Sequence, residues 1–185
     1  MNYSIRPLQP KDATRMLEWM HDEDVTRYLR LNGKNTTRMD VLRFIQEAQD
    51  ETVNLHRAVV DCEDTYFGTI SLKNIDFVKK EAEYAIAMHP SAIGTGAACA
   101  ASREIFTLGI QELCLRRIYL NVMAENSRAI AFYRKLSQFG LVEETVTRTQ
   151  INGAEKTLLW FNLAAEAFQK TKQGDSSHGD ERTVD

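Results

Sequence analysis

Residues 81–100, EAEYAIAMHPSAIGTGAACA, are the stretch from which the rest of the sequence is interpreted. A strand is predicted to end at His89-Pro90, a loop of small residues follows, and a helix is predicted to begin at or just after Gly96. Gly94 and Gly96 allow the backbone to approach a ligand closely. The helix directs free N–H groups and the positive end of its dipole into the loop. The stretch therefore predicts a phosphate-binding site that needs no basic side chain.

Other interpretations of the loop differ in how well they fit its residues. A Walker loop ends in Gly-Lys-Ser/Thr, whereas this loop ends in Gly-Ala-Ala. A dinucleotide-binding fingerprint needs a third, suitably spaced glycine at the first strand of a repeated βαβ unit. The simplest alternative, that Gly-Thr-Gly marks only a tight strand-to-helix turn, stays open on the loop alone.

About thirty residues downstream, residues 122–136 are VMAENSRAIAFYRKL. Asn126 or Ser127 is suited to cap the helix that follows, and the Asn126 amide can also turn toward a ligand at such a strand-to-helix crossing. Tyr133 lies one or two turns into this helix. Its phenol, with an ordinary pKa of about 10, suits proton donation to a leaving group of similar basicity such as a thiolate. Neighbouring Phe132 is predicted to lie in the core.

The remaining segments predict a mixed α/β fold with helices packed on one sheet. Expected strands cover residues 3–8, 56–61, 67–74, 82–88, 117–122, 142–149 and 156–163; expected helices begin at Pro10 and Thr37, include a short one around Val25, and cover 96–113 and 127–136. Asn152-Gly153, between two strand-like runs, is the strongest hairpin signal. From about Lys170 apolar residues almost disappear. We therefore expect one domain over residues 1–166 and a polar, disordered tail over residues 167–185.

Composition argues against several classes of protein. A chain of 185 residues suits one domain, and its formal net charge of -3 argues against attachment to nucleic acid or an anionic membrane by bulk charge. No run approaches the roughly 20 apolar residues of a membrane span, and the N-terminus lacks an apolar signal core, so a soluble, cytoplasmic protein is expected. The three cysteines and four histidines show no metal-ligand spacing, so no metal is expected.

The ordered set of motifs resembles the GNAT superfamily of acetyl-CoA-dependent N-acetyltransferases. A strand with Glu-Tyr is followed by Gly-x-Gly-x-Ala at a helix start and then by Asn-x-x-Ala-x-x-x-Tyr. The resemblance covers residues 5–163 and is strongest to the branch of ribosomal-protein N-terminal, spermidine and amino-sugar acetyltransferases. The opening Ile5-Arg-Pro-Leu and the closing Ile151-Asn-Gly support that placement. The resemblance implies a central, mostly antiparallel sheet of about seven strands flanked by helices.

The resemblance also implies acetyl-CoA as cosubstrate and a role for each matching residue. The main-chain N–H groups that would hold the CoA pyrophosphate belong to Ile93, Gly94, Thr95, Gly96, Ala97 and Ala98. The strand segment of Ile86, Ala87 and Met88 would pair with the pantetheine arm. Asn126 would contact the cofactor, and Tyr133 would protonate the departing CoA thiolate.

Two positions depart from the family's usual sequence. Ile93 stands where Gln or Arg is usual, which removes a helpful side chain and predicts weaker CoA binding while the backbone site is kept. Lys135-Leu-Ser-Gln-Phe-Gly-Leu141 stands where Lys-Leu-Gly-Phe is usual. The extra residues change the end of the helix and could reshape the acceptor-side wall.

The amine acceptor needs a base and a binding surface. An alkylammonium, with a pKa of about 10, must lose a proton before it can attack. Glu83 is the candidate base, with Glu81 on the same strand face as its alternative; Glu83 can equally be a strand carboxylate paired with a neighbouring lysine such as Lys79 or Lys80.

The acceptor is expected against the early helices, with Trp19, Asp24 and Tyr28 as candidate contacts, because carboxylates and aromatic rings suit a cationic amine. A solvated acidic loop is the competing interpretation of this region. His21 and His89 are possible proton relays, although a lone histidine is more often structural.

Three functional classes are consistent with these features. The first is an N-acetyltransferase that acts on a primary amine of a small molecule or a protein N-terminus. The second is a GNAT-like protein that binds acyl-CoA without turnover, as a sensor or scaffold. The third is another α/β nucleotide-binding module, against which Asn126 and Tyr133 argue. A homodimer is possible, since dimers are common in the resembling branch.

Overall fold

One sheet of seven strands organises the computed structural model, which describes residues 2–29, 33–151 and 153–176. The strands lie in the order β1-β2-β3-β4-β5-β7-β6. Their bounds are β1 Tyr3–Pro7, β2 Leu55–Asp61, β3 Tyr66–Asp76, β4 Glu81–Met88, β5 Arg117–Met123, β6 Val142–Ile151 and β7 Ala154–Ala164. All neighbouring strands are antiparallel except β4 and β5. The predicted mixed α/β fold with a mostly antiparallel sheet is confirmed.

The parallel pair of β4 and β5 is short. Its register contains three residue pairs, of which the last joins Glu83 to Tyr119. Beyond this point β4 stays paired with β3 as far as Met88, while β5 stays paired with β7 as far as Met123. The two strands therefore separate and leave a split in the middle of the sheet.

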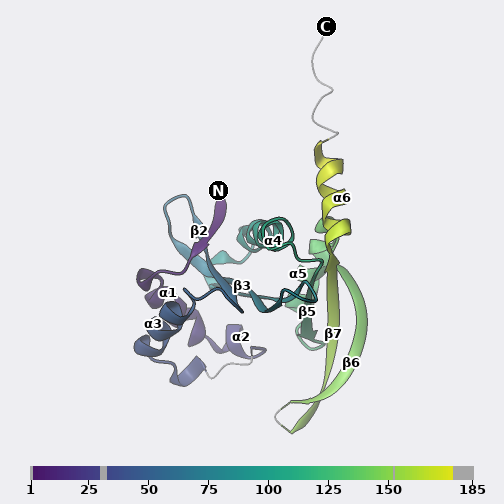
Figure 1. The fold of residues 1–185 in the computed structure, drawn as a ribbon. Helices are drawn as coiled ribbons and strands as arrows, with labels where there is room; N and C mark the ends of the chain where they lie inside the picture. Colours follow the sequence, from purple (N-terminus) through teal and green to yellow (C-terminus); the bar gives the residue numbers. More distant parts are fainter. Residues whose placement is uncertain (1, 30–32, 152, 177–185) are drawn as a thin grey trace.

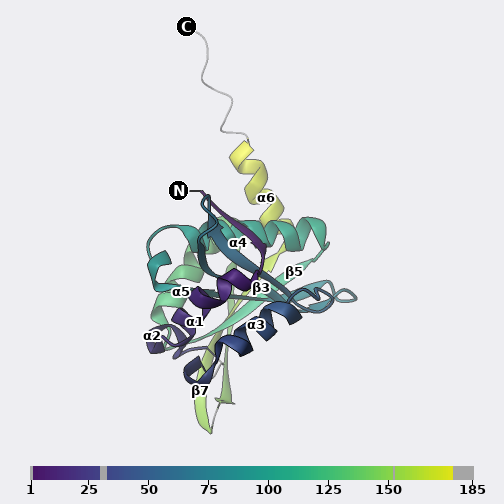
Figure 2. The same ribbon diagram turned by 90° about the vertical axis from the view of Figure 1, so that its left-hand side faces the viewer.

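Helices cover the two faces of the sheet (Figure 1). On one face lie α4 (Ala97–Thr107), which continues into a π-helical turn over Leu108–Glu112, and α5 (Ser127–Lys135). On the other face lie α1 (Ala13–Met20) and α3 (Arg38–Glu47), with the short α2 (Glu23–Thr26) beside them, as the turned view in Figure 2 shows.

Each face has its own apolar cluster. The cluster under α4 and α5 includes Ile70, Leu72, Tyr84, Phe106, Ile118, Leu120, Tyr133, Phe161 and Leu163. The cluster under α1 and α3 includes Leu8, Met16, Trp19, Val41, Ile45, Ala58, Val60 and Tyr66. Strand alternation explains the division, because successive side chains of one strand point to opposite faces: in β2, Val59 belongs to the first cluster and Ala58 and Val60 to the second.

Local sequence signals fix several helix starts. The side chain of Thr37 accepts a hydrogen bond from the Asp40 N–H and the Asp40 side chain accepts one from the Thr37 N–H, which confirms the predicted capping box of α3. Asp22 caps α2, and the Asn126 side chain accepts from the Ala129 N–H at the start of α5. Such caps satisfy main-chain donors that a helix leaves unpaired.

The C-terminal part differs from the expected disordered tail. Helix α6 (Ala165–Ser176) follows β7 directly and covers the first ten residues of the predicted tail 167–185. Phe168 is 1% exposed, and its ring packs edge-on against Phe106 with centroids 6.2 Å apart. One buried aromatic residue in a polar segment therefore holds this helix to the core. The domain boundary at residue 166 is corrected on this evidence, and residues 177–185 lie outside the described residues.

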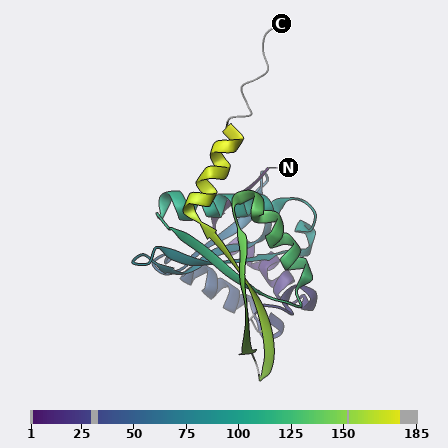
Figure 3. The same cartoon turned by 90° about the vertical axis from the view of Figure 1, so that its right-hand side faces the viewer.

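The hairpin of β6 and β7 projects past the ends of the other strands of the sheet (Figure 3). β6 and β7 pair from Val142 to the turn, where Ile151 faces Ala154. The predicted two-residue turn stands at this place; Gly153 has a φ of 76°, whereas Asn152 lies outside the described residues. Within the described part of the chain, no helix has the length and apolar content needed to cross a bilayer.

Replacing Phe168 tests the correction of the C-terminal segment. We expect Phe168→Ala to lower the free energy of unfolding by about 3 kcal/mol, because it leaves a cavity beside Phe106. Phe77→Ala is the control, since Phe77 is 53% exposed. Urea unfolding measures both. Equal stability of Phe168→Ala and the wild type would contradict the packing of α6 on the core.

Candidate active site

The edge of β4 that faces the split carries free main-chain groups. The His89 N–H donates to the Phe67 carbonyl at 2.8 Å. In an antiparallel pair every second residue bonds to the partner strand, so Ala87 and Ala85 also direct their main-chain groups to β3. The N–H and C=O groups of Ile86 and Met88 consequently point away from β3. Past Glu83 no strand pairs with this edge in the described part of the chain. An extended, amide-containing ligand can add here as a further strand.

The glycine loop follows this strand. Gly94 and Gly96 have φ values of 76° and 86°, in the left-handed region that favours glycine. A Cβ built at either position meets no atom within 4 Å, so the space beside both backbones is open. A group as bulky as a phosphate can therefore approach the main chain closely at this place.

Helix α4 begins directly behind the loop. The Ala97 N–H donates to the Thr95 hydroxyl oxygen at 3.2 Å. Within the described chain no hydrogen-bond acceptor is found for the N–H groups of Gly94, Gly96, Ala98 and Cys99. These unpaired donors and the positive end of the α4 dipole suit an anion without a cationic side chain, and binding of the CoA pyrophosphate here remains a prediction. Ile93 is 56% exposed and adds no polar contact to this site.

Asn126 confirms one of its two predicted roles. Its Oδ1 accepts the Ala129 N–H at 3.1 Å and so caps α5. Its Nδ2 has no acceptor among the described residues and is left to donate to a ligand. The contact with the cofactor remains a prediction.

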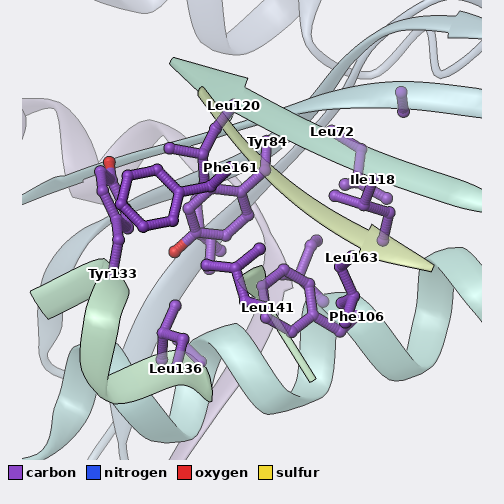
Figure 4. Close-up of a cluster of buried hydrophobic side chains, with 14 of the residues drawn as sticks. Leu72, Tyr84, Phe106, Ile118, Leu120, Tyr133, Leu136, Leu141, Phe161 and Leu163 are labelled. Atoms are coloured by element: carbon purple, nitrogen blue, oxygen red, sulfur yellow. The ribbon is translucent and has the colours of Figure 1, made fainter. Parts of the chain in front are cut away.

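Tyr133 stands at the α5 side of the split. Its ring packs between Phe161 and Tyr84, with centroid distances of 5.7 and 6.2 Å. Figure 4 shows its hydroxyl at the edge of this cluster, directed away from the core side chains. The hydroxyl has no hydrogen-bond partner in the described chain, and burial raises the pKa of Tyr133 to about 12. The phenol is therefore protonated at neutral pH, as a proton donor must be, while Phe132 is only partly buried beside it.

Glu83 lies where β4 and β5 separate, but it is already paired. Its carboxylate accepts from the Asn74 amide at 3.0 Å and lies 3.4 Å from the Lys73 ammonium. The ion-pair partner is thus Lys73, not Lys79 or Lys80. Glu81 pairs with Arg117 at 3.5 Å. A base role for Glu83 remains a prediction. To act as a base, the Glu83 carboxylate would have to accept the proton of the amine in competition with its ion pair with Lys73.

The three predicted acceptor residues of the early helices lie in different environments: one is in the core, one is exposed, and one reaches the site region. Trp19 is 3% exposed, and its indole N–H donates to the Tyr66 hydroxyl at 3.0 Å, so it belongs to the core and its assignment to the acceptor surface is corrected. Asp24 is exposed and paired with Arg27. Tyr28 reaches the site region, because its hydroxyl donates to the Glu125 carbonyl at 3.2 Å, next to Asn126.

The two candidate relay histidines both have structural contacts. The His21 imidazole lies 2.9 Å from the Thr36 carbonyl. His89 accepts the Ser91 N–H at 3.1 Å, and its other ring nitrogen lies 3.0 Å from Glu18. His89 therefore ties α1 to the turn that precedes the glycine loop.

Sequence reasoning missed two contributors to the site. Tyr84 packs against Tyr133, and its hydroxyl lies 2.8 Å from the Ser102 hydroxyl in a fully buried pair. The alternation of side chains along β4 could have indicated that Tyr84 points into the core. Arg15 lies 3.0 Å from the Ser91 hydroxyl through its guanidinium, a contact between distant segments that no local sequence signal marks.

Comparison with known proteins agrees with this geometry. A model of the acetyltransferase (GNAT) domain matches residues 3–137. The chain belongs to the GNAT acetyltransferase family. The predicted family and fold are thereby confirmed, and in the described chain no group of three or more His, Cys, Asp or Glu side chains is arranged to hold a metal ion.

Individual relatives cover different shares of the chain. Spermidine N(1)-acetyltransferase of Escherichia coli (strain K12) is 36% identical over 97 residues, 52% of this chain and 52% of the relative, so the chain matches about half the length of that protein. "Putative ribosomal N-acetyltransferase YdaF" of Bacillus subtilis (strain 168) is 26% identical over 177 residues, 91% of this chain and 94% of YdaF. A Vibrio cholerae spermidine N-acetyltransferase, solved with CoA and spermine, shares the fold with a TM-score of 0.79 at 20% identity, over 90% of this chain and 98% of that one.

A bulky residue at Gly96 tests the anion site. We expect Gly96→Val to weaken CoA binding at least about ten-fold in calorimetry, because its side chain fills the open space beside the backbone and strains a left-handed φ. Gly153→Val is a matched control: Gly153 has a φ of 76° and equally open space but lies in the β6–β7 turn. Normal affinity of a folded Gly96→Val protein would refute the phosphate assignment.

Proposed function

We propose that this protein transfers the acetyl group of acetyl-CoA to a primary amine by direct attack. The observation that carries the proposal is the protonated and unpaired hydroxyl that the buried Tyr133 ring holds beside the split where β4 leaves β5. An extended thioester cosubstrate fits the free edge of Ile86 and Met88, and its pyrophosphate fits the glycine loop. In the proposed complex the thioester sulfur lies within reach of this proton donor.

The reaction follows from the positions of these groups. The neutral amine nitrogen attacks the thioester carbonyl carbon and forms the new C–N bond, and the charge that develops on oxygen is stabilised by main-chain N–H groups of β4 that face the split. The C–S bond then breaks, and Tyr133 gives its proton to the CoA thiolate. The amine loses its own proton to Glu83 or to water, which balances the charge.

The acceptor class is supported by the relatives. The Escherichia coli and Vibrio cholerae proteins are spermidine acetyltransferases, which favours a polyamine as the first acceptor to test. YdaF, by its name a ribosomal N-acetyltransferase, matches 91% of the chain and favours a ribosomal amine as the second. Release of CoA thiol from acetyl-CoA across polyamines, amino sugars, aminoglycosides and peptides with an N-terminal Ala or Ser separates these acceptors. Tight acetyl-CoA binding without thiol release from any of them would favour the non-catalytic sensor instead.

Removal of the Tyr133 hydroxyl tests the proton-donor role. We expect Tyr133→Phe to lower kcat about 10²-fold while acetyl-CoA affinity stays within about two-fold of the wild type, since positioned acids contribute about 10²–10⁴. Tyr84→Phe is the matched control, because it also removes a tyrosine hydroxyl from the same aromatic cluster, but one that is buried and directed to Ser102. Unchanged kcat in Tyr133→Phe would remove Tyr133 from this role.

The pH profile of the same proteins gives a second criterion. Because burial raises the pKa of Tyr133 to about 12, the phenol stays protonated, and its contribution to stability is complete below about pH 10 and lost as the pH rises through 12. We expect kcat to rise with pH as the amine deprotonates. We expect no decline of kcat with rising pH anywhere below pH 10. A loss of kcat with a pKa below 10 that disappears in Tyr133→Phe would contradict the raised pKa.

A further inference from the structure

Two side chains of α1 contact the turn from which the glycine loop starts. This turn is a single turn of 3-10 helix, Pro90–Ala92, directly after β4. The Arg15 guanidinium donates to the Ser91 hydroxyl oxygen at 3.0 Å, and the Glu18 carboxylate lies 3.0 Å from Nε2 of His89. The turn is therefore held by a helix from a distant part of the chain as well as by its own backbone.

The imidazole of His89 has a defined hydrogen-bond pattern. Its Nδ1 accepts the Ser91 N–H at 3.1 Å, and the Ser91 hydroxyl and the Arg15 guanidinium lie 2.7 and 3.4 Å from the same nitrogen. Since all three neighbours of Nδ1 can donate, these contacts assign the ring hydrogen to Nε2, which donates to Glu18. His89 therefore caps the turn with one ring nitrogen and binds α1 with the other.

The turn transmits this constraint to the main-chain donors of the loop. The Ala92 carbonyl accepts the Thr95 N–H at 3.3 Å and the Thr95 hydroxyl at 2.8 Å. The Thr95 hydroxyl oxygen accepts the Ala97 N–H at the start of α4. Gly94 and Gly96 lie between these contacts, so the direction of their N–H groups, which have no acceptor in the described chain, depends on the turn.

Arg15 occupies its position at a cost in stability. Its guanidinium carbon lies 5.7 Å from the centre of the Phe67 ring, and Phe67 is the residue whose carbonyl accepts the His89 N–H. The Arg15 Nε is buried without an acceptor in the described chain. A buried donor without a partner costs free energy of folding. A role for Arg15 in the function of the turn would explain why this cost is tolerated.

We propose that Arg15, Glu18 and His89 are positioning residues for the cosubstrate. They fix the Pro90–Ala92 turn and thereby the direction of the N–H groups that the glycine loop offers to the CoA pyrophosphate. A site that is already ordered binds more tightly, because less freedom is lost on binding. The inference rests on the proposed function and deepens it, since it gives α1 a part in cosubstrate affinity and none in the chemical step.

Calorimetric titration with CoA measures this effect without turnover. Arg15→Met, which removes the guanidinium but keeps an aliphatic side chain over Phe67, should weaken CoA binding about ten-fold. Arg57→Met is the matched control and should stay within about two-fold of the wild type, because the Arg57 guanidinium is also half-buried but binds Glu51 instead of the turn. Equal affinity of folded Arg15→Met and the wild type, or an equal loss in Arg57→Met, would overturn the proposal.

Two His89 variants test the capping contact. His89→Ala should weaken CoA binding about ten-fold, and His89→Asn should recover part of the affinity, because its side-chain oxygen can still accept the Ser91 N–H. In steady-state kinetics, Arg15→Met and His89→Ala should raise the acetyl-CoA KM and leave kcat within about two-fold of the wild type. A His89→Asn protein as weak as His89→Ala, or a lower kcat at unchanged KM, would contradict the positioning role.

Amide NMR signals of the free protein give a readout that needs no ligand. The signals of Gly94 and Gly96 should shift or broaden in Arg15→Met, while that of Ala129 at the start of α5 should not change. Unchanged Gly94 and Gly96 signals would refute the inference. Tight CoA binding by the wild type without acetyl transfer to any amine would refute the proposed function, and a loss of CoA affinity in Arg15→Met would still support the positioning role.

Discussion

The short parallel pairing of β4 and β5 is the constraint on which the site depends. Had the pair continued past Glu83 and Tyr119, the N–H and C=O groups of Ile86 and Met88 would be satisfied by β5. Because β5 instead stays paired with β7, an edge of β4 is left unpaired in the middle of the sheet. An edge in this position is less open to pairing with a strand of another molecule than an outer edge would be. A ligand strand is what such an edge can accept.

The same geometry explains how a mildly acidic chain can hold a phosphate-rich cosubstrate. The net charge is -3, so bulk attraction is absent. The main-chain donors of Gly94, Gly96 and Ala98 and the α4 dipole supply the positive potential locally. Glu83, on the other face of the sheet, is paired with Lys73.

Sequence alone predicted the fold and the cofactor side of the site in some detail. Strand runs, the Thr37 capping box and the Gly94–Gly96 loop are local signals, written within a few residues of one another, and each is found where expected. The acceptor side could not be predicted in this way. Trp19 and Trp160 look alike in sequence, and only long-range packing decides that the first is enclosed by α3 and β3 while the second stays accessible. The burial of Phe168 likewise depends on packing against the distant Phe106. The polar composition of the C-terminal segment gave no indication of it.

Amide exchange along β4 tests the central claim most directly. NMR should show fast exchange for the N–H groups of Ile86 and Met88 in the free protein, and slow exchange for those of Ala85 and Ala87, which bond to β3. Addition of CoA should protect Ile86 or Met88 and leave Ala85 and Ala87 unchanged. Protection of Ile86 and Met88 already in the free protein, or no change at either on CoA binding, would contradict the account.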